Sequence, residues 1–377
     1  MQRRLIVAGA CGLVVGAGLM TVVSRVRASS RRPATVTAAT DVVEPAANVP
    51  AGSTAPAEPV PPPPPVPADP PPGQQVHLEL RNVDLQMAGG LSLYVQRMQG
   101  LLVSTDPGHE AVFDDPNSFV IKAHSADVRM TLAMLDKVMN DRVFDYQGAD
   151  VEKIHSKVTD SGKLEQKGKL DKGIDVPFKV KGELSATEDG RIRFHGKSTK
   201  AFHLPVKPLM KLFSIEMDDM VKVKPGRGVE VVDNDFIIDP SLILPPPRML
   251  GKVTSVRLDG DSIVMHMGSG EVKRTYEAPI SPNHVYFHGG NIRFGKLSMH
   301  GSDLELIDQD PRDAFKFSVP RYNDQLVAGY SKNTPDHGLK TYMPDIDGLK
   351  GAGDPGTAKA ARTGRRGRHG RVARASR

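Results

Sequence analysis

Two histidines and two short acidic runs are the residues whose types and spacing could hold a metal ion. His284 and His288 are four residues apart, a spacing that would put both on one face of a helix. The neighbouring residues predict a strand instead, in which the two side chains would be separated by roughly 13 Å, too far to share one ion. Residues 233–235 (Asp-Asn-Asp) and 308–310 (Asp-Gln-Asp) could bind calcium, but neither continues into an EF-hand pattern, so we interpret both as turns. We therefore expect no metal and no cofactor.

Ser262 is the serine whose neighbours could make it a nucleophile. The run 260–263 (Gly-Asp-Ser-Ile) resembles the start of a GDSL-type esterase motif, in which the serine leaves a strand and enters a helix. Here the serine is followed by the alternating residues Ile263, Met265 and Met267, which predict a strand, so the run is better interpreted as a turn. The sequence contains no G-x-S-x-G, phosphate-binding glycine loop or H-E-x-x-H. We predict that the protein is not an enzyme.

Methionine is the residue type with an unusual distribution. Nine of the fifteen methionines lie between Met130 and Met267. Methionine is flexible and polarisable, and it suits surfaces that accommodate variable apolar partners. Two interpretations stay open: ordinary filling of a core, and an apolar groove for a ligand.

The elements that would position these side chains are mainly strands. Residues 174–184 alternate apolar and polar types with a period of two, which places one face in a core and the other in water. Three hairpins are expected, over residues 174–194, 229–238 and 256–267. Further short strands, broken at glycines, are expected over residues 284–307.

Two amphipathic helices are expected beside these strands. The first runs from Ser125, as its N-cap, to Asn140. Its apolar stripe comprises Val128, Leu132, Leu135 and Met139. The second begins at Pro205 or Pro208, runs to Val221 and includes the apolar residues Leu209, Phe213, Met217 and Met220. Both apolar faces are wide, so the sheet or another apolar body must cover them.

Charge is concentrated at the two ends of the chain. Residues 1–32 carry +6 and residues 351–377 carry +7, so the remaining residues hold −7. A mildly acidic middle, together with no tryptophan and few aromatic residues, argues against a nucleic-acid partner. The single cysteine, Cys11, excludes a disulfide scaffold.

The ends also differ from the middle in their expected organisation. Residues 1–27 include an unbroken run of nineteen uncharged residues, Leu5 to Val23, which predicts a transmembrane signal-anchor or, alternatively, a cleaved signal peptide. Residues 28–73 hold fourteen prolines and are expected to form a disordered tether, with a PxxP ligand as the alternative. Residues 346–377 are expected to form a disordered basic tail that is solvated or binds anionic lipid or an acidic polymer.

The order of segments between residues 120 and 270 resembles a known family. The pattern comprises the first helix, Val176-Pro-Phe-Lys-Val-Lys-Gly-Glu-Leu-Ser185, Leu204-Pro-Val with the second helix, and Ile238-Asp-Pro-Ser-Leu-Ile-Leu-Pro-Pro-Pro247 before Gly251-Lys-Val-Thr-Ser-Val256. It resembles the bacterial LmeA-like phospholipid-binding family, which is similar to the tubular lipid-binding (TULIP) superfamily. The resemblance implies an α+β fold, in which a strongly curved, mainly antiparallel sheet wraps around one or two amphipathic helices.

The resemblance also implies a site and a location. Residues 74–345 would form a lipid-binding domain, in which residues 271–345 are an extra sheet or module that the resemblance does not cover. The implied partners are a phospholipid or other acyl lipid and, through the N-terminal helix, a membrane. The protein would be single-pass in the bacterial inner membrane, with its main domain periplasmic. The residues expected to line an apolar trough are Val128, Leu132, Leu135, Met139, Phe178, Phe194, Leu209, Phe213, Met217, Met220, Met265 and Met267.

Three other functions stay open at this point. The first is a structural envelope protein with a closed core, whose basic tail binds an acidic polymer. The second is an RNA-associated protein that uses the arginines of the tail, and the third is a hydrolase built around Ser262. An internal apolar cavity would argue against the first, an exported location against the second, and an unchanged activity of Ser262→Ala against the third.

Overall fold

The structure is a computed structural model, and it describes residues 63–171, 175–201, 221–269, 274, 276–277, 279–336 and 338–349. The predicted membrane segment, most of the proline-rich tether, the second predicted helix and the basic tail beyond residue 349 lie outside the described residues. Among the helices that are described, none combines the length and the hydropathy that a membrane crossing requires.

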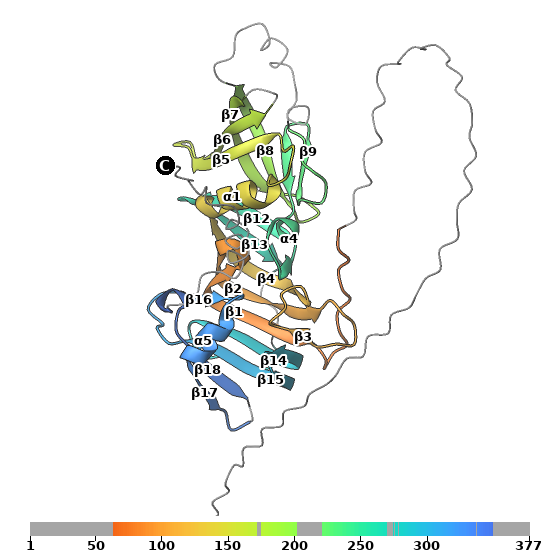
Figure 1. Ribbon diagram of the computed structural model, residues 1–377, viewed down its shortest axis with the longest axis vertical. Coiled ribbons are helices and arrows are strands. Elements are labelled where there is room, and N and C mark those ends of the chain that lie inside the picture. The colour runs from red at the N-terminus through yellow and green to blue at the C-terminus, as the bar shows by residue number, and fades with distance from the viewer. Residues whose placement is uncertain are drawn as a thin grey trace, which may run out of the picture. The chain divides into compact units, whose positions relative to one another are not determined.

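Within the described residues, twelve strands form the larger of two sheets (Figure 1). Its path, in spatial order, is β12 (Val253–Asp259), β13 (Ser262–Gly268), β4 (Phe119–Thr131), β2 (Leu91–Ser104), β1 (Val76–Met87), β14 (His284–Phe294), β15 (Leu297–Asp308), β18 (Leu339–Met343) and β17 (Tyr330–Asn333). Three short strands pair beside this path: β3 (Ala111–Val112), β11 (Arg248–Leu250) and β16 (Phe315–Ser318). The three short strands and the β15–β18 pair are parallel, and the other neighbours along the path are antiparallel.

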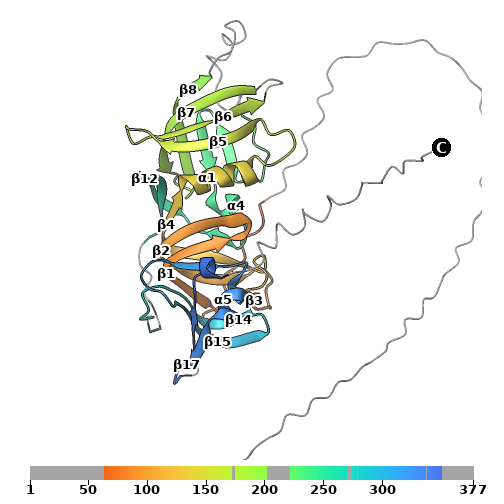
Figure 2. The ribbon, with the colours of Figure 1, turned by 60° about the vertical axis from the view of Figure 1, so that its left-hand side comes forward.

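Six strands in the described part of the chain form the second sheet, and all of its pairs are antiparallel. Their order is β5 (Val151–Val158), β6 (Leu164–Asp171), β7 (Asp175–Ala186), β8 (Ile192–Ala201), β10 (Asp235–Ile238) and β9 (Val229–Val232). This sheet curls over helix α1 (Leu132–Val138) and the π-helical turn η2 (Met139–Val143) that continues it (Figure 2). The shorter helical elements are η1 (Ala88–Gly90), α4 (Pro240–Ile243), α5 (Tyr322–Ala328) and η3 (Ile346–Gly348).

The expectation of a curved, mainly antiparallel sheet is confirmed. The three predicted hairpins form as β7–β8, β9–β10 and β12–β13. The strands predicted over residues 284–307 also form, but as two long strands instead of several short ones. The glycines that were expected to break them, Gly289, Gly290 and Gly301, have φ of 77°, 48° and 62° and lie inside β14 and β15. Positive φ is open to glycine without steric cost, so the strands bend there and continue.

The prediction of a helix from Ser125 is wrong over its first half. Residues 119–131 form β4, which pairs with β2 on one side and β13 on the other. Ala126, Val128 and Met130 are buried while Thr131 is exposed, which is the period of two expected for a strand. The helix begins only at Leu132. The apparent helical stripe therefore joined the inward residues of a strand to those of the helix that follows it.

Two long strands at the centre of the larger sheet were not predicted. Residues 76–104 form β1 and β2, and β1 pairs with β14 about 200 positions further along the chain. The strands β14, β15 and β18 therefore continue this sheet directly. One cluster of buried apolar side chains joins the inner faces of both sheets.

The junction of β13 and β4 gives a stability prediction. Gly268 ends β13 at φ +76°, and a Cβ atom there would lie 1.7 Å from the carbonyl oxygen of His124. Gly260, in the β12–β13 turn, has φ +60° and no atom within 4 Å of the same position. We expect Gly260→Ala to lower the free energy of unfolding by about 1 kcal/mol, the cost of a left-handed alanine. Gly268→Ala should cost about 3 kcal/mol, because the strands must also separate.

The free energies of unfolding of the two full-length variants are measured by urea titration, with circular dichroism as the signal. Equal losses for Gly268→Ala and Gly260→Ala would contradict the close approach of β13 and β4.

Candidate functional site

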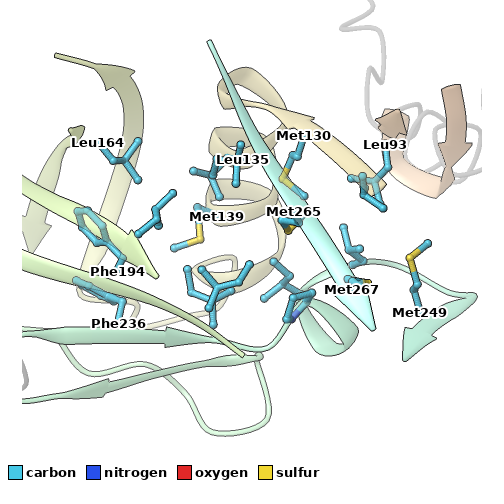
Figure 3. Close-up of a pocket in the computed structure, with 18 of the residues that line it drawn as sticks. Leu93, Met130, Leu135, Met139, Leu164, Phe194, Phe236, Met249, Met265 and Met267 are labelled. Carbon is cyan, nitrogen blue, oxygen red and sulfur yellow. The ribbon is translucent and has the colours of Figure 1, made fainter. Parts of the chain in front are cut away.

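An apolar cavity lies between the two sheets, beside α1 (Figure 3). Strands β4 and β13 of the larger sheet form one wall, and strands β6, β7, β8 and β10 of the second sheet form another. Figure 3 shows Leu164, Phe194 and Phe236 on one side of the helix residues and Met249, Met267 and Leu93 on the other. Among the described residues that line the cavity, Gln166 is the single polar one.

The alternation of the strands places the lining side chains. Along β13, Ile263, Met265 and Met267 are buried and line the cavity. The half-buried Val264 lies between them and points to the opposite face, because successive side chains of a strand alternate. On β8, Ile192 and Phe194 line the cavity in the same way.

Helix α1 contributes Leu135, and Met139, the first residue of η2, lines the cavity one turn further on. The helix starts where β4 ends, because the Thr131 hydroxyl accepts a hydrogen bond from the Met134 backbone N–H at 3.2 Å and so caps its N-terminus. The backbone N–H of Leu132 also donates to the Asp261 carbonyl at 2.8 Å, which ties the first turn to the β12–β13 loop.

The other end of the helical segment is tied to the second sheet. The Asn140 side chain donates to the carbonyl of Ile154 on β5 and accepts from the backbone N–H of the same residue, both at 2.8 Å. Arg142 donates to the carbonyls of Ile243 and Leu244, at 2.9 and 3.3 Å, and both of these residues line the cavity. Hydrogen bonds thus fix the helical segment to the β12–β13 loop, to β5 and to the cavity-lining residues Ile243 and Leu244.

The cavity is narrow, and its described lining is almost entirely apolar. Its volume is about 40 Å³, enough for about three water-sized groups. Gln166, its polar residue, donates to the Ser156 hydroxyl at 3.3 Å. This lining attracts apolar groups, and none of the described side chains in it is a nucleophile, an acid or a base.

Methionines make the lining adaptable. Five of them line the cavity: Met130, Met139, Met249, Met265 and Met267. An unbranched side chain with three rotatable bonds changes its shape at small cost, so such a wall can widen around a ligand.

The structure brings together six of the twelve residues expected to line a trough: Val128, Leu135, Met139, Phe194, Met265 and Met267. Leu132 is buried but does not line the cavity. Phe178 is half-buried, and its ring covers Gly168, the residue opposite it on β6. Leu209, Phe213, Met217 and Met220 lie outside the described residues.

Several lining residues were missed by the sequence analysis. Ile263 and Ile192 belong to predicted strands and alternate in phase with Met265 and Phe194, so the same periodicity could have identified them. Leu93 lies on β2, which was not predicted. Pro240 and Ile243 lie in α4, which has only four residues and is too short to show a periodic pattern.

The residues with metal-like or nucleophilic spacing lie elsewhere. Ser262 is the first residue of β13, as its alternating neighbours predicted, and its hydroxyl donates to Asp261 at 3.0 Å. His284 and His288 lie on β14, where His284 Nδ1 is 2.6 Å from the Ser281 carbonyl and His288 Nδ1 is 3.1 Å from the Tyr286 hydroxyl. No group of three or more His, Cys, Asp or Glu side chains in the described residues is placed to hold a metal ion.

A scan against models of protein families, a search of curated proteins and a search of solved structures each found no match for this chain. The resemblance to the LmeA-like family therefore stays a prediction, and the function is inferred from the cavity and the sequence.

One leucine and one valine of α1 provide a test of the cavity itself. Leu135 lines it, whereas Val138, which is 1% exposed, packs in the core away from it. We expect Leu135→Ala to cost about 2–5 kcal/mol and Val138→Ala somewhat less, because both leave unfilled space. Leu135→Ala should also increase the binding of an apolar fluorescent probe to the full chain, because it enlarges the cavity.

Val138→Ala is the matched control, and its probe binding should equal that of the unchanged chain. Equal probe binding by both variants would contradict a cavity at Leu135.

Proposed function

We propose that the chain is a non-catalytic lipid-binding protein that sequesters or carries acyl chains in the cavity beside α1. The observation that carries this proposal is the methionine-rich apolar lining between a curled sheet and a helix. An acyl carrier needs an apolar surface that can accommodate a chain and little polar chemistry, and this adaptable lining supports both requirements.

The energetics favour opening of the narrow cavity around a chain. Burying ten methylene groups stabilises the complex by about 8 kcal/mol. Immobilising one flexible side chain in a new position costs about 0.5–1.5 kcal/mol. The total for the five lining methionines is therefore smaller than the free energy gained by burying the methylene groups. An acyl chain can therefore provide the free energy that widens its own site.

We also propose that the chain is an LmeA-like protein that is tethered to a membrane. A curled antiparallel sheet that covers an amphipathic helix is what a TULIP-like domain would have, and this agreement supports the LmeA-like resemblance. The uncharged run near the N-terminus and the proline-rich segment after it support a tethered protein with an extracytoplasmic domain. In such a protein the tether would let the domain reach lipids near the membrane.

One observation favours a second function. A cavity of about 40 Å³ is small for a carrier, and a structural envelope protein with a closed core would have such a gap. In that case the basic tail would supply the binding surface, for an acidic polymer.

Two neighbouring residues of β13 separate these functions. Met265 faces the cavity, whereas Val264 lies opposite Arg129 and Arg257 on the other face of the sheet. We expect Met265→Glu to remove co-purifying lipid, because a carboxylate in an apolar site opposes acyl burial. Val264→Glu should keep the lipid, because the new carboxylate would face arginines.

Lipid is quantified by mass spectrometry after denaturing extraction of each full-length variant, and circular dichroism checks the fold. If Met265→Glu does not fold, the uncharged Met265→Gln is used, and it should still reduce the lipid content. Equal lipid content in folded Met265 and Val264 variants would rule out the cavity as the lipid site. If the unchanged chain carries no lipid, the structural envelope protein with a closed core is favoured instead.

A further inference from the structure

We propose that a groove on the polar face of the larger sheet binds an oxyanion of the phosphate class, held by Arg81 and Arg97. The groove is formed by strands β1, β2 and β4 together with Arg274, Pro282, Asn283 and Pro311, and its volume is about 740 Å³. It lies on the face of β1 that carries Glu79 and Arg81, whereas Leu78 and Leu80 of the same strand pack in the core. The proposal is therefore independent of the apolar cavity.

Two carboxylates line the groove, and each is already engaged by a cation. Glu79, which is 4% exposed, accepts from Nε and Nη2 of Arg274, with the Nε contact at 2.7 Å. Asp127 accepts from Arg97 Nε at 2.5 Å and lies 2.5 Å from His266 Nδ1. Neither carboxylate is left to balance a further positive charge.

Arg81 is that further charge. The Arg81 side chain is exposed, and it makes no hydrogen bond or ion pair with another described residue. In the register of β1 and β2, Arg81 lies directly opposite Arg97, and on its other side it lies opposite His284 of β14. Like charges directly opposite each other destabilise a sheet. An oxyanion between the two guanidinium groups would replace this repulsion with charge-assisted hydrogen bonds.

The rim of the groove is held by a hydrogen-bond network. Asn82, at φ +51°, bulges from β1 next to Arg81 and donates to the Asn283 side chain at 2.7 Å. The Tyr94 hydroxyl donates to the Asn82 side chain at 2.8 Å, which links β2 to the same point. The backbone that carries Arg81 is therefore fixed before any ligand binds, which lowers the entropic cost of binding.

Isothermal titration calorimetry of the full chain with inorganic phosphate, at low ionic strength, tests the proposal. We expect saturable binding, and we expect Arg81→Gln to weaken the affinity for phosphate by about tenfold or more, because the charge-assisted hydrogen bonds of the Arg81 guanidinium are lost. Arg257→Gln is the matched control: Arg257 is 65% exposed on β12 of the same sheet, and its partner Asp259 keeps Arg129 at 2.8 Å. This variant removes the same charge and should bind phosphate as the unchanged chain does.

The stability of the variants separates binding from structure. Without phosphate, Arg81→Gln should be as stable as the unchanged chain or more stable, since one of two opposed charges is gone. Glycerol 1-phosphate is titrated in parallel: tighter binding than phosphate identifies a lipid head group as the source, and equal binding identifies free phosphate. The proposal is overturned by absence of phosphate binding, by equal weakening in Arg257→Gln, or by unfolding of Arg81→Gln in a buffer without phosphate.

Discussion

The position of helix α1 is the constraint on which the rest of the structure depends. Thr131 is both the last residue of β4 and the N-cap of the helix, so the larger sheet determines where the helix begins. Asn140 then fixes the end of the helix to the edge strand of the second sheet. Because each sheet holds one end, the apolar side of the helix faces the space between them, and the cavity forms there.

The larger sheet separates two kinds of chemistry by simple alternation. On β13, Met265 belongs to the apolar cavity, while the neighbouring His266 contacts Asp127 on the polar face. On β1, the core residue Leu80 precedes Arg81 of the polar groove. A period of two thus lets strands of one sheet carry an apolar cavity on one face and a polar groove with three arginines on the other.

Local periodicity predicted those parts of the fold that depend on neighbours in the sequence. The hairpins β7–β8 and β12–β13 alternate clearly, and their inward residues include Phe194, Met265 and Met267 of the cavity. The first helix was placed too early, because inward strand residues such as Val128 fall at helical spacing from Leu132 and Leu135. Val128 and Leu135 line the same cavity, although they come from different elements.

Pairing between distant segments could not be predicted from these patterns. The bulge at Asn82 shifts the alternation of β1 by one residue, which obscures a strand of twelve residues. The groove depends on Arg81 lying opposite Arg97, and this register follows from the pairing of whole strands rather than from any local motif. Four residues expected in the apolar site lie outside the described residues, so their place in it stays a prediction.

The central claim is that the cavity beside α1 holds an acyl chain. Native mass spectrometry of the unmodified full chain, purified in an amphipathic polymer instead of detergent, tests this claim most directly. We expect a bound species of lipid mass in stoichiometric amount, which is released on unfolding and identified as an acyl lipid. A folded chain that carries no lipid, and takes up none from phospholipid vesicles, would contradict it.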